Sequence, residues 1–215
     1  MRLPRFKKIS SFRSNLSNHV TKSTARTILI AAIITEGLVI IVAALLWGLF
    51  DLAIFITPSW HGALLGVVAT LPLLVLNEVT HRYALRVPES TAGQFSREVV
   101  VPLCANVSPA LAAILGLLSG TCEELLFRGA LPPLFSPFLG NVGAGFASSA
   151  LFAWVHFIGQ ERRFAPIILL YLGVGLYFWG LTLLTGDLFS AMVCHGLHNF
   201  FVINITRMTD KSTTL

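Results

Sequence analysis

Charged side chains are scarce in this chain, and their scarcity argues against a soluble globular protein. Only 12% of the 215 residues are Asp, Glu, Lys or Arg, and 55% are hydrophobic. Soluble domains average about 25% charged residues. Runs of about 20 apolar residues are typical of transmembrane helices. We therefore expect an all-α, polytopic membrane helix bundle with about six spans, near residues 27–50, 61–80, 106–134, 141–158, 165–184 and 188–206.

Cysteine is also rare, which excludes a disulfide framework or a paired-cysteine metal site. We interpret Cys104, Cys122 and Cys194 as small buried hydrophobic residues. Cys122 directly precedes Glu123, and Cys194 directly precedes His195. A thiol nucleophile needs a neighbouring base of this kind. A cysteine peptidase therefore remains a minor alternative. No HExxH motif occurs, so the familiar metalloprotease helix is absent.

Positive charge is missing from alternate connections between the spans. Residues 1–26 hold seven Lys or Arg and no acid, and further basic residues lie in 81–98, 159–164 and the C-terminal tail. No Lys or Arg occurs in 51–60, 135–140 or 185–187. Because basic loops stay on the cytoplasmic side, we expect both termini in the cytoplasm, and for so short a chain the bacterial inner (plasma) membrane. The net charge of +5 then reflects topology, and we expect no nucleic-acid partner.

The same pattern divides the chain into four expected segments. The first is a basic cytoplasmic segment and the second contains two transmembrane helices with a cytoplasmic loop. The third is a helix bundle that carries the polar motifs, and the fourth is a short tail. Their expected bounds are 1–26, 27–98, 99–207 and 208–215.

Residues 99–160 contain only three side chains that are charged at neutral pH, Glu123, Glu124 and Arg128. A charge at the centre of a bilayer costs at least about 2.5–3.5 kcal/mol, so this cluster indicates a functional site. Glu124 and Arg128 are four residues apart and share a helix face, where we expect them to pair. Glu123 is turned about 100° away. It has no partner in its own helix, so it must find one on another helix or be protonated.

Two further polar motifs occur in later apolar runs. Phe152 and His156 are four residues apart and share a helix face, and so do His195 and Asn199. Between the last two, Gly196 would let another helix approach closely.

Together, three spans supply polar side chains that should meet in the bundle interior. A carboxylate, two imidazoles and an amide can activate water and bind an oxyanion. Glu123, His156 and His195 would also make a catalytic zinc set. However, Asn199 suits an oxyanion hole better than a metal shell, and His156 has no charged neighbour in helical register to orient it. We therefore favour a mechanism without a cofactor, with Zn²⁺ as the alternative.

The patterns Glu-Glu-x-x-x-Arg, Phe-x-x-x-His and His-x-x-x-Asn, in this order, resemble the three motifs of the CPBP family. This family comprises type II CAAX prenyl proteases and bacteriocin-processing or self-immunity proteins, once called the Abi family. The resemblance covers about residues 106–206 and implies a membrane-embedded peptidase of glutamic type, or a metallo-endopeptidase. It implies that Glu123 activates water with His156, and that His195 and Asn199 stabilise the oxyanion, although the two histidines could exchange roles. The supporting residues are then Glu124, Arg128 and Phe152.

The implied partners are the lipid bilayer and a peptide or protein substrate at or in the membrane, either a prenylated CAAX protein or a bacteriocin-type precursor. Neither prenylation nor oligomeric state can be read from the residues. Two other classes stay open. One is a non-catalytic immunity or scaffold protein. The other is a transporter with Glu36, Glu123 and Glu124 as intramembrane carboxylates, although no inverted repeat supports it.

The prolines at 132, 133 and 137 predict the turn between the third and fourth spans. With that turn and one near 186 at the same membrane face, the helical rise puts Glu123 about 21 Å from this face. The same rise puts His156 at about 28 Å and His195 at about 13 Å. Tilted helices, or a turn near 186 that dips into the bundle, would be needed to bring the three side chains together.

Overall fold

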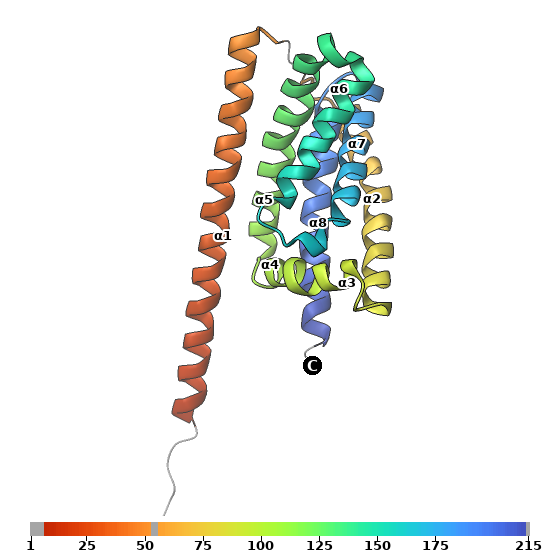
Figure 1. Ribbon diagram of the computed structural model, residues 1–215. Coiled ribbons are helices and arrows are strands. Elements are labelled where there is room, and N and C mark those ends of the chain that lie inside the picture. Colours follow the sequence, from red (N-terminus) through yellow and green to blue (C-terminus); the bar gives the residue numbers. More distant parts are fainter. Residues whose placement is uncertain (1–6, 53–55, 214–215) are drawn as a thin grey trace, which may run out of the picture.

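The computed structural model (Figure 1) describes residues 7–52 and 56–213, and describes side chains over 26–52 and 56–209. The described residues contain no strand, and the expected all-α membrane helix bundle is confirmed. Most basic residues of the expected cytoplasmic segment 1–26 lie outside the residues whose side chains are described. The long helices are α1 (Lys7–Phe50), α2 (Trp60–Arg86), α5 (Pro109–Glu124), α6 (Leu131–Phe157), α7 (Ile167–Thr185) and α8 (Phe189–Thr213). The short helical segments are α3 (Thr91–Phe95), η1 (Ser96–Val100), α4 (Val101–Ala105), η2 (Leu125–Ala130) and η3 (Arg162–Phe164).

Four of the described helical stretches are long and apolar enough to cross a membrane. They are Arg26–Phe50, Trp60–Arg86, Pro109–Phe157 and Ile167–Thr185. The third contains 49 residues, which is about twice what one crossing needs. The expected last span, α8, is not among them, because it contains many polar residues. A polytopic bundle is therefore present, and the count of six crossings stays a prediction.

The stretch Pro109–Phe157 folds back on itself. Its backbone breaks at Gly140, where φ is 66° and ψ is 169°, a conformation that glycine adopts without a steric penalty. Two contacts join the arms on either side of this break. The Ser148 hydroxyl donates to the Phe127 carbonyl, and His156 lies against Glu123. The contact farther from Gly140 joins the lower-numbered residue of the first arm to the higher-numbered residue of the second. The two arms are therefore antiparallel and form a helical hairpin.

The position of this reversal corrects the expected turn. The prolines at 132 and 133 begin α6, and Pro137 lies inside its helical stretch. A proline in the first turn of a helix lacks only a hydrogen bond that would not form there anyway. With the turn at Gly140, Glu123 is 17 residues before it and His156 is 16 residues after it, so both lie about 25 Å along their arms. The expected difference in depth between these two side chains therefore disappears.

The bundle carries apolar side chains outside and charged side chains inside. Leu49, Leu117 and Leu184 are 75%, 70% and 87% exposed, whereas Glu124 is 0% and His195 is 3% exposed. Soluble proteins almost never bury charged residues unless they are paired. A lipid surround explains both halves of this distribution, because it accepts apolar side chains and drives polar ones inward.

Helices α5 and α8 approach each other through glycines. A Cβ added to Gly116 would lie 2.5 Å from the carbonyl oxygen of Gly196, and one added to Gly120 would lie 2.6 Å from its nitrogen. Small residues permit this spacing between membrane helices, as expected for Gly196. Since Glu124 is one turn beyond Gly120, and His195 precedes Gly196, the glycine contact brings the first polar motif against the third.

We predict that Gly120→Ala destabilises the protein by about 1–3 kcal/mol, the usual cost of overpacking. The atoms that the new methyl group would meet belong to the backbone of α8 and cannot rotate away. Thermal unfolding of the purified protein in detergent would measure the change.

The matched control is Gly173→Ala in α7, where an added Cβ meets nothing within 4 Å. There the same substitution should be neutral or stabilising by about 0.4–1 kcal/mol. Equal unfolding temperatures for the two variants would contradict the proposed packing of α5 on α8.

Candidate active site

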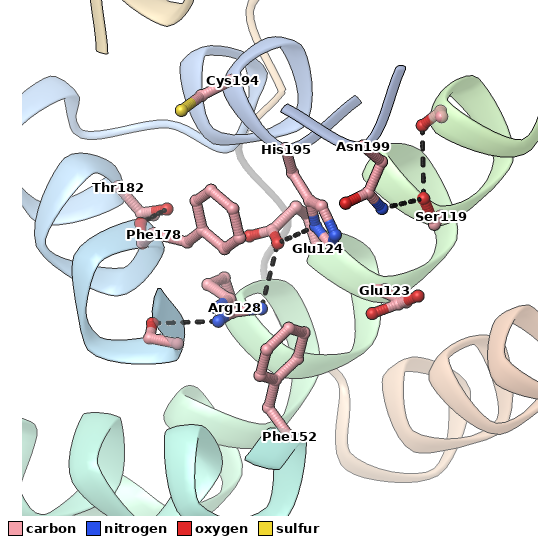
Figure 2. A network of polar contacts seen from close by, with 12 residues as sticks. Ser119, Glu123, Glu124, Arg128, Phe152, Phe178, Thr182, Cys194, His195 and Asn199 are labelled. Carbon is pink, nitrogen blue, oxygen red and sulfur yellow. Dashed lines mark hydrogen bonds and ion pairs between the residues drawn. The ribbon is translucent and has the colours of Figure 1, made fainter. Parts of the chain in front are cut away.

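The three polar motifs meet in the interior of the bundle: Figure 2 shows the first and third motifs with Phe152 of the second, and His156 lies against Glu123. The first lies at the end of α5 and in η2, the second near the end of α6 and the third in α8. η2 is a π-helical turn that follows Glu124 directly, and all six of its residues are buried. π-helical turns inside α-helices occur frequently at functional sites. Here the π-helical turn carries Arg128, whose guanidinium group lies against Glu124.

Glu124 is held between two cationic or donor groups. Its Oε1 accepts a hydrogen bond from Nη1 of Arg128 at 3.0 Å and lies 2.8 Å from Nδ1 of His195. Arg128 also donates from Nη2 to the carbonyl oxygen of Gly175 in α7, at 2.9 Å. Because a carboxylate only accepts, Nδ1 of His195 must carry a proton. The expected pair of Glu124 with Arg128 is therefore present, and it extends to His195.

Aromatic rings surround this buried charge pair. The guanidinium carbon of Arg128 lies 4.5 Å from the ring centroid of Phe152 and 5.3 Å from that of Phe178. The ring of Phe178 also stacks on His195, with centroids 4.6 Å apart and planes inclined by 18°. Cation–π contacts of this kind gain strength when they are desolvated. The rings thus stabilise the arginine and fix the plane of the imidazole.

Glu123 faces a different set of groups. Its Oε2 lies 3.6 Å from Nε2 of His156, which is too far for a direct hydrogen bond. The other imidazole nitrogen, Nδ1, lies 2.8 Å from the carbonyl oxygen of Phe152 and must carry a proton, since a carbonyl only accepts. Tyr171 stacks on the same imidazole, with centroids 4.8 Å apart. Because Nδ1 is engaged by the Phe152 carbonyl, Nε2 is the imidazole nitrogen directed at Glu123.

Asn199 lies on the same side of α8 as His195. Its amide nitrogen donates to the Ser119 hydroxyl at 2.8 Å, and this hydroxyl donates in turn to the carbonyl oxygen of Leu115 at 2.9 Å (Figure 2). The amide orientation is thereby set by α5. One hydrogen of the Asn199 amide group remains for another acceptor.

A cavity of about 230 Å³ is lined in part by His156, His195 and Asn199, and also by His81 and His198. Its walls come from α2, α7 and α8 and from the α3–η1 segment, and they are mostly apolar. Glu123 is not among the lining residues, so His156 stands between it and the cavity. The mostly apolar walls suit an apolar ligand, and His156, His195 and Asn199 are among the polar side chains that such a ligand would meet.

Four residues at the site were not among those expected from the motifs. Ser119, Tyr171 and Phe178 carry no signal in the sequence, because serine and aromatic residues are common in apolar helices. Glu36 carries a signal in the sequence, because it is the only acidic residue in the segment that forms α1. It is 8% exposed, and its carboxyl lies within hydrogen-bonding reach of that of Glu123.

The alternative zinc set does not form in this arrangement. Among the described residues, no three His, Cys, Asp or Glu side chains lie close enough together to hold a metal ion. His195 directs Nδ1 to Glu124, and His156 directs Nδ1 to a backbone carbonyl. Glu123, His156 and His195 therefore do not fit a shared ion in the geometry described.

The cysteines contribute nothing visible to the site. Cys104 and Cys194 are buried and Cys122 is half-buried, and all three are free thiols. In Figure 2 the sulfur of Cys194 points away from the polar network. The alternative of a cysteine peptidase gains no support from this placement.

We predict that Glu124→Gln and Arg128→Gln each lower the free energy of unfolding by about 3–5 kcal/mol, because each leaves a buried charge without its partner. The double variant should lose much less than the sum of the two. A double-mutant cycle on stability in detergent measures this coupling. Additive losses would mean that the two side chains do not interact.

The comparisons with known proteins bear on this region alone. No curated protein and no solved structure matches the chain. The family model described as type II CAAX prenyl endopeptidase, Rce1-like, matches residues 105–201, which contain all three polar motifs. The resemblance indicated by those motifs is therefore confirmed, and residues 105–201 are similar to the type II CAAX prenyl endopeptidase, Rce1-like, family.

Proposed function

We propose that this protein is an intramembrane endopeptidase in which Glu123 activates water. The observation that carries the proposal is the juxtaposition of the Glu123 carboxylate with Nε2 of His156, at 3.6 Å, beside a second pair of polar side chains that line a mostly apolar cavity. The family match implies CAAX-type protease activity in general terms. Glutamate chemistry is the more specific part of the proposal.

Water activation follows from the orientation of His156. With Nδ1 protonated, its Nε2 and the free Oε2 of Glu123 are two acceptors that can bind the two hydrogens of one water molecule. As the water oxygen bonds to the scissile carbonyl carbon, its proton passes to Glu123. When the carbon–nitrogen bond breaks, the leaving amine takes a proton from Glu123, directly or through His156. General base and acid catalysis of this kind contributes about 10²–10⁴-fold.

His195 and Asn199 are suited to hold the oxyanion. The Glu124 carboxylate accepts from Nδ1 of His195. We propose that it stabilises His195 as the imidazolium during the reaction, so that Nε2–H becomes a donor to the oxyanion. The second amide hydrogen of Asn199, which is not used in the bond to Ser119, is another hydrogen-bond donor. Removing one such donor costs about 10²–10³-fold in rate. This geometry favours His156 as the partner of Glu123 and His195 as the oxyanion donor, rather than the reverse.

The substrate that we propose is a peptide carried by a membrane-associated protein. The cavity walls from α2 and α7 are apolar over most of their area, which suits a hydrocarbon or an apolar peptide segment. We further propose that hydrolysis needs no metal ion, since the three candidate ligands do not converge.

We predict that Glu123→Gln lowers kcat by at least about 10²-fold while the protein remains folded, because the amide cannot accept the proton of water. Cleavage of a farnesylated peptide ending in a CAAX sequence, and of the same peptide without the farnesyl group, would be followed by mass spectrometry. The control is Glu78→Gln, a carboxyl on the exposed face of α2 that bonds only to Arg82 in the same helix.

Near wild-type turnover by Glu123→Gln would reject the proposal. One equivalent of zinc in the purified protein, with reversible loss of turnover on chelation, would also reject it. Glu123 would then be assigned as a zinc ligand and not as the general base. A folded protein that cleaves neither peptide calls for trapping of native substrates on Glu123→Gln in membranes. Failure to trap any would favour the non-catalytic alternative.

We also propose that both termini face the cytoplasm. Figure 1 places α3, α4 and the connection between α6 and α7 at the end of the bundle where the C-terminus lies. At this end Arg163 binds Glu98 at 2.5 Å, and Arg97 lies 4.0 Å from Glu89. Basic residues from separate connections thus gather on one side, as cytoplasmic loops do.

The test uses a variant of the protein whose three native cysteines are replaced, expressed in sealed bacterial cells. We predict that a membrane-impermeant thiol reagent labels this variant at Thr57→Cys and not at Glu89→Cys. Both positions are exposed, so the difference reports the side of the membrane and not burial. Permeabilised cells provide the control, in which both cysteines should react. Labelling of Glu89→Cys in sealed cells would invert the proposed topology.

A further inference from the structure

Glu36 is an anomaly in helix α1. Its neighbours Ile33, Ile34 and Leu38 are 53%, 57% and 59% exposed, as expected of a helix that faces lipid. Glu36 itself is 8% exposed. An acid within a membrane span is costly, and such residues almost always face the bundle interior and a partner.

The partner of Glu36 is Glu123. The two carboxyl groups lie within hydrogen-bonding reach of each other, where α1 packs against α5. One oxygen of each carboxyl, Oε2, has no hydrogen-bond partner among the described residues. The acid of α1 therefore meets the acid that we propose as the base, although α1 lies outside the region matched by the family.

Among the residues whose side chains are described, we find no cation bound to either of the two acids. The ionisable groups that face Glu123 from the other elements are His156, Tyr171 and Arg128. Arg128 is already bound to Glu124 and to a backbone carbonyl. His156 lies 3.6 Å from Glu123, too far for a direct hydrogen bond.

A hydrogen bond between two carboxyl groups requires one proton between them. Two carboxylates in contact cannot both stay ionised, and one proton shared by the pair removes the repulsion. The protonated member then donates its O–H to the other, which stays an acceptor with a fixed orientation. Charge-assisted O–H···O⁻ bonds of this kind are short and about twice as strong as neutral ones.

We propose that Glu36 is a positioning residue of the active site, which in its protonated form donates a hydrogen bond to the Glu123 carboxylate and holds it ionised and directed at His156. This inference rests on the proposed role of Glu123. Glu36 touches no reacting atom, and the free Oε2 of Glu123 remains available to water. Helix α1 then completes a site whose other polar groups come from α5, α6 and α8.

The test compares Glu36→Ala with Glu36→Gln. The alanine variant removes the donor, so kcat should fall by about 10²-fold while KM stays within about twofold. The glutamine variant keeps an N–H donor at nearly the same place, so its kcat should stay within about tenfold of wild type. Thr35→Ala is the matched control, because Thr35 is the preceding residue of α1 and is exposed.

Equal kcat values for Glu36→Ala and Thr35→Ala would overturn the inference. So would equal losses in Glu36→Ala and Glu36→Gln, since a donor at this position would then have no effect. Unfolding temperatures of all variants identify any loss that comes from misfolding, and the nearly isosteric glutamine variant keeps the test decisive if the alanine variant does not fold.

An infrared measurement separates this inference from the proposed function. The C=O stretch of a protonated carboxyl group should be present in the wild-type protein and in Thr35→Ala at neutral pH, and absent in Glu36→Gln. A band that persists in Glu36→Gln would show that Glu36 does not hold the proton. This readout needs no turnover, so it remains valid even if the wild-type protein cleaves no peptide.

Discussion

The carboxylate of Glu124, held between Arg128 and His195, is the interaction on which the rest of the site depends. A charge pair buried among apolar helices is tolerated only when each member keeps its partner. This pair also connects helices, because Arg128 reaches a carbonyl of α7 and His195 belongs to α8. The same carboxylate that neutralises the arginine therefore sets the tautomer and the direction of an imidazole on another helix.

Adjacent acids acquire different properties from their surroundings. Glu124 is fully buried and accepts from Arg128 and His195 at one oxygen, whereas Glu123 lies beside His156 with no hydrogen bond as short as these. The rotation of about 100° between consecutive residues of a helix turns one acid toward α7 and α8 and the other toward α1 and α6. Environment, rather than residue type, then separates a structural carboxylate from one available for proton transfer.

The described site is larger than the region that matches the family. Residues 105–201 supply all three motifs, yet α2 forms part of the cavity wall and α1 brings Glu36 to Glu123. The glycine contact of α5 with α8 holds the two polar motifs together, while α1 and α2 close the surrounding space. Differences in these two helices would alter which substrate enters and how Glu123 is held, without any change in the motifs.

Local geometry explains what could be read from the sequence. The scarcity of charge identified a membrane bundle, and spacings of four residues identified the pair of Glu124 with Arg128. They also put His195 and Asn199 on one face of a helix. These inferences succeed because helical periodicity depends only on neighbouring residues. The apolar runs likewise located the long helices, including α8, although its polar residues keep it from being apolar enough to count as a span.

Tertiary structure decided the rest. The hairpin turns at Gly140 and not at the prolines, because a proline can begin a helix as readily as it can end one. His195 binds Glu124 and not Glu123, and Glu36 meets Glu123 across a gap of 87 residues in the chain. Such contacts depend on how helices are rotated and shifted against one another. Close packing at a few glycines determines that alignment, and no periodicity within a single helix records it.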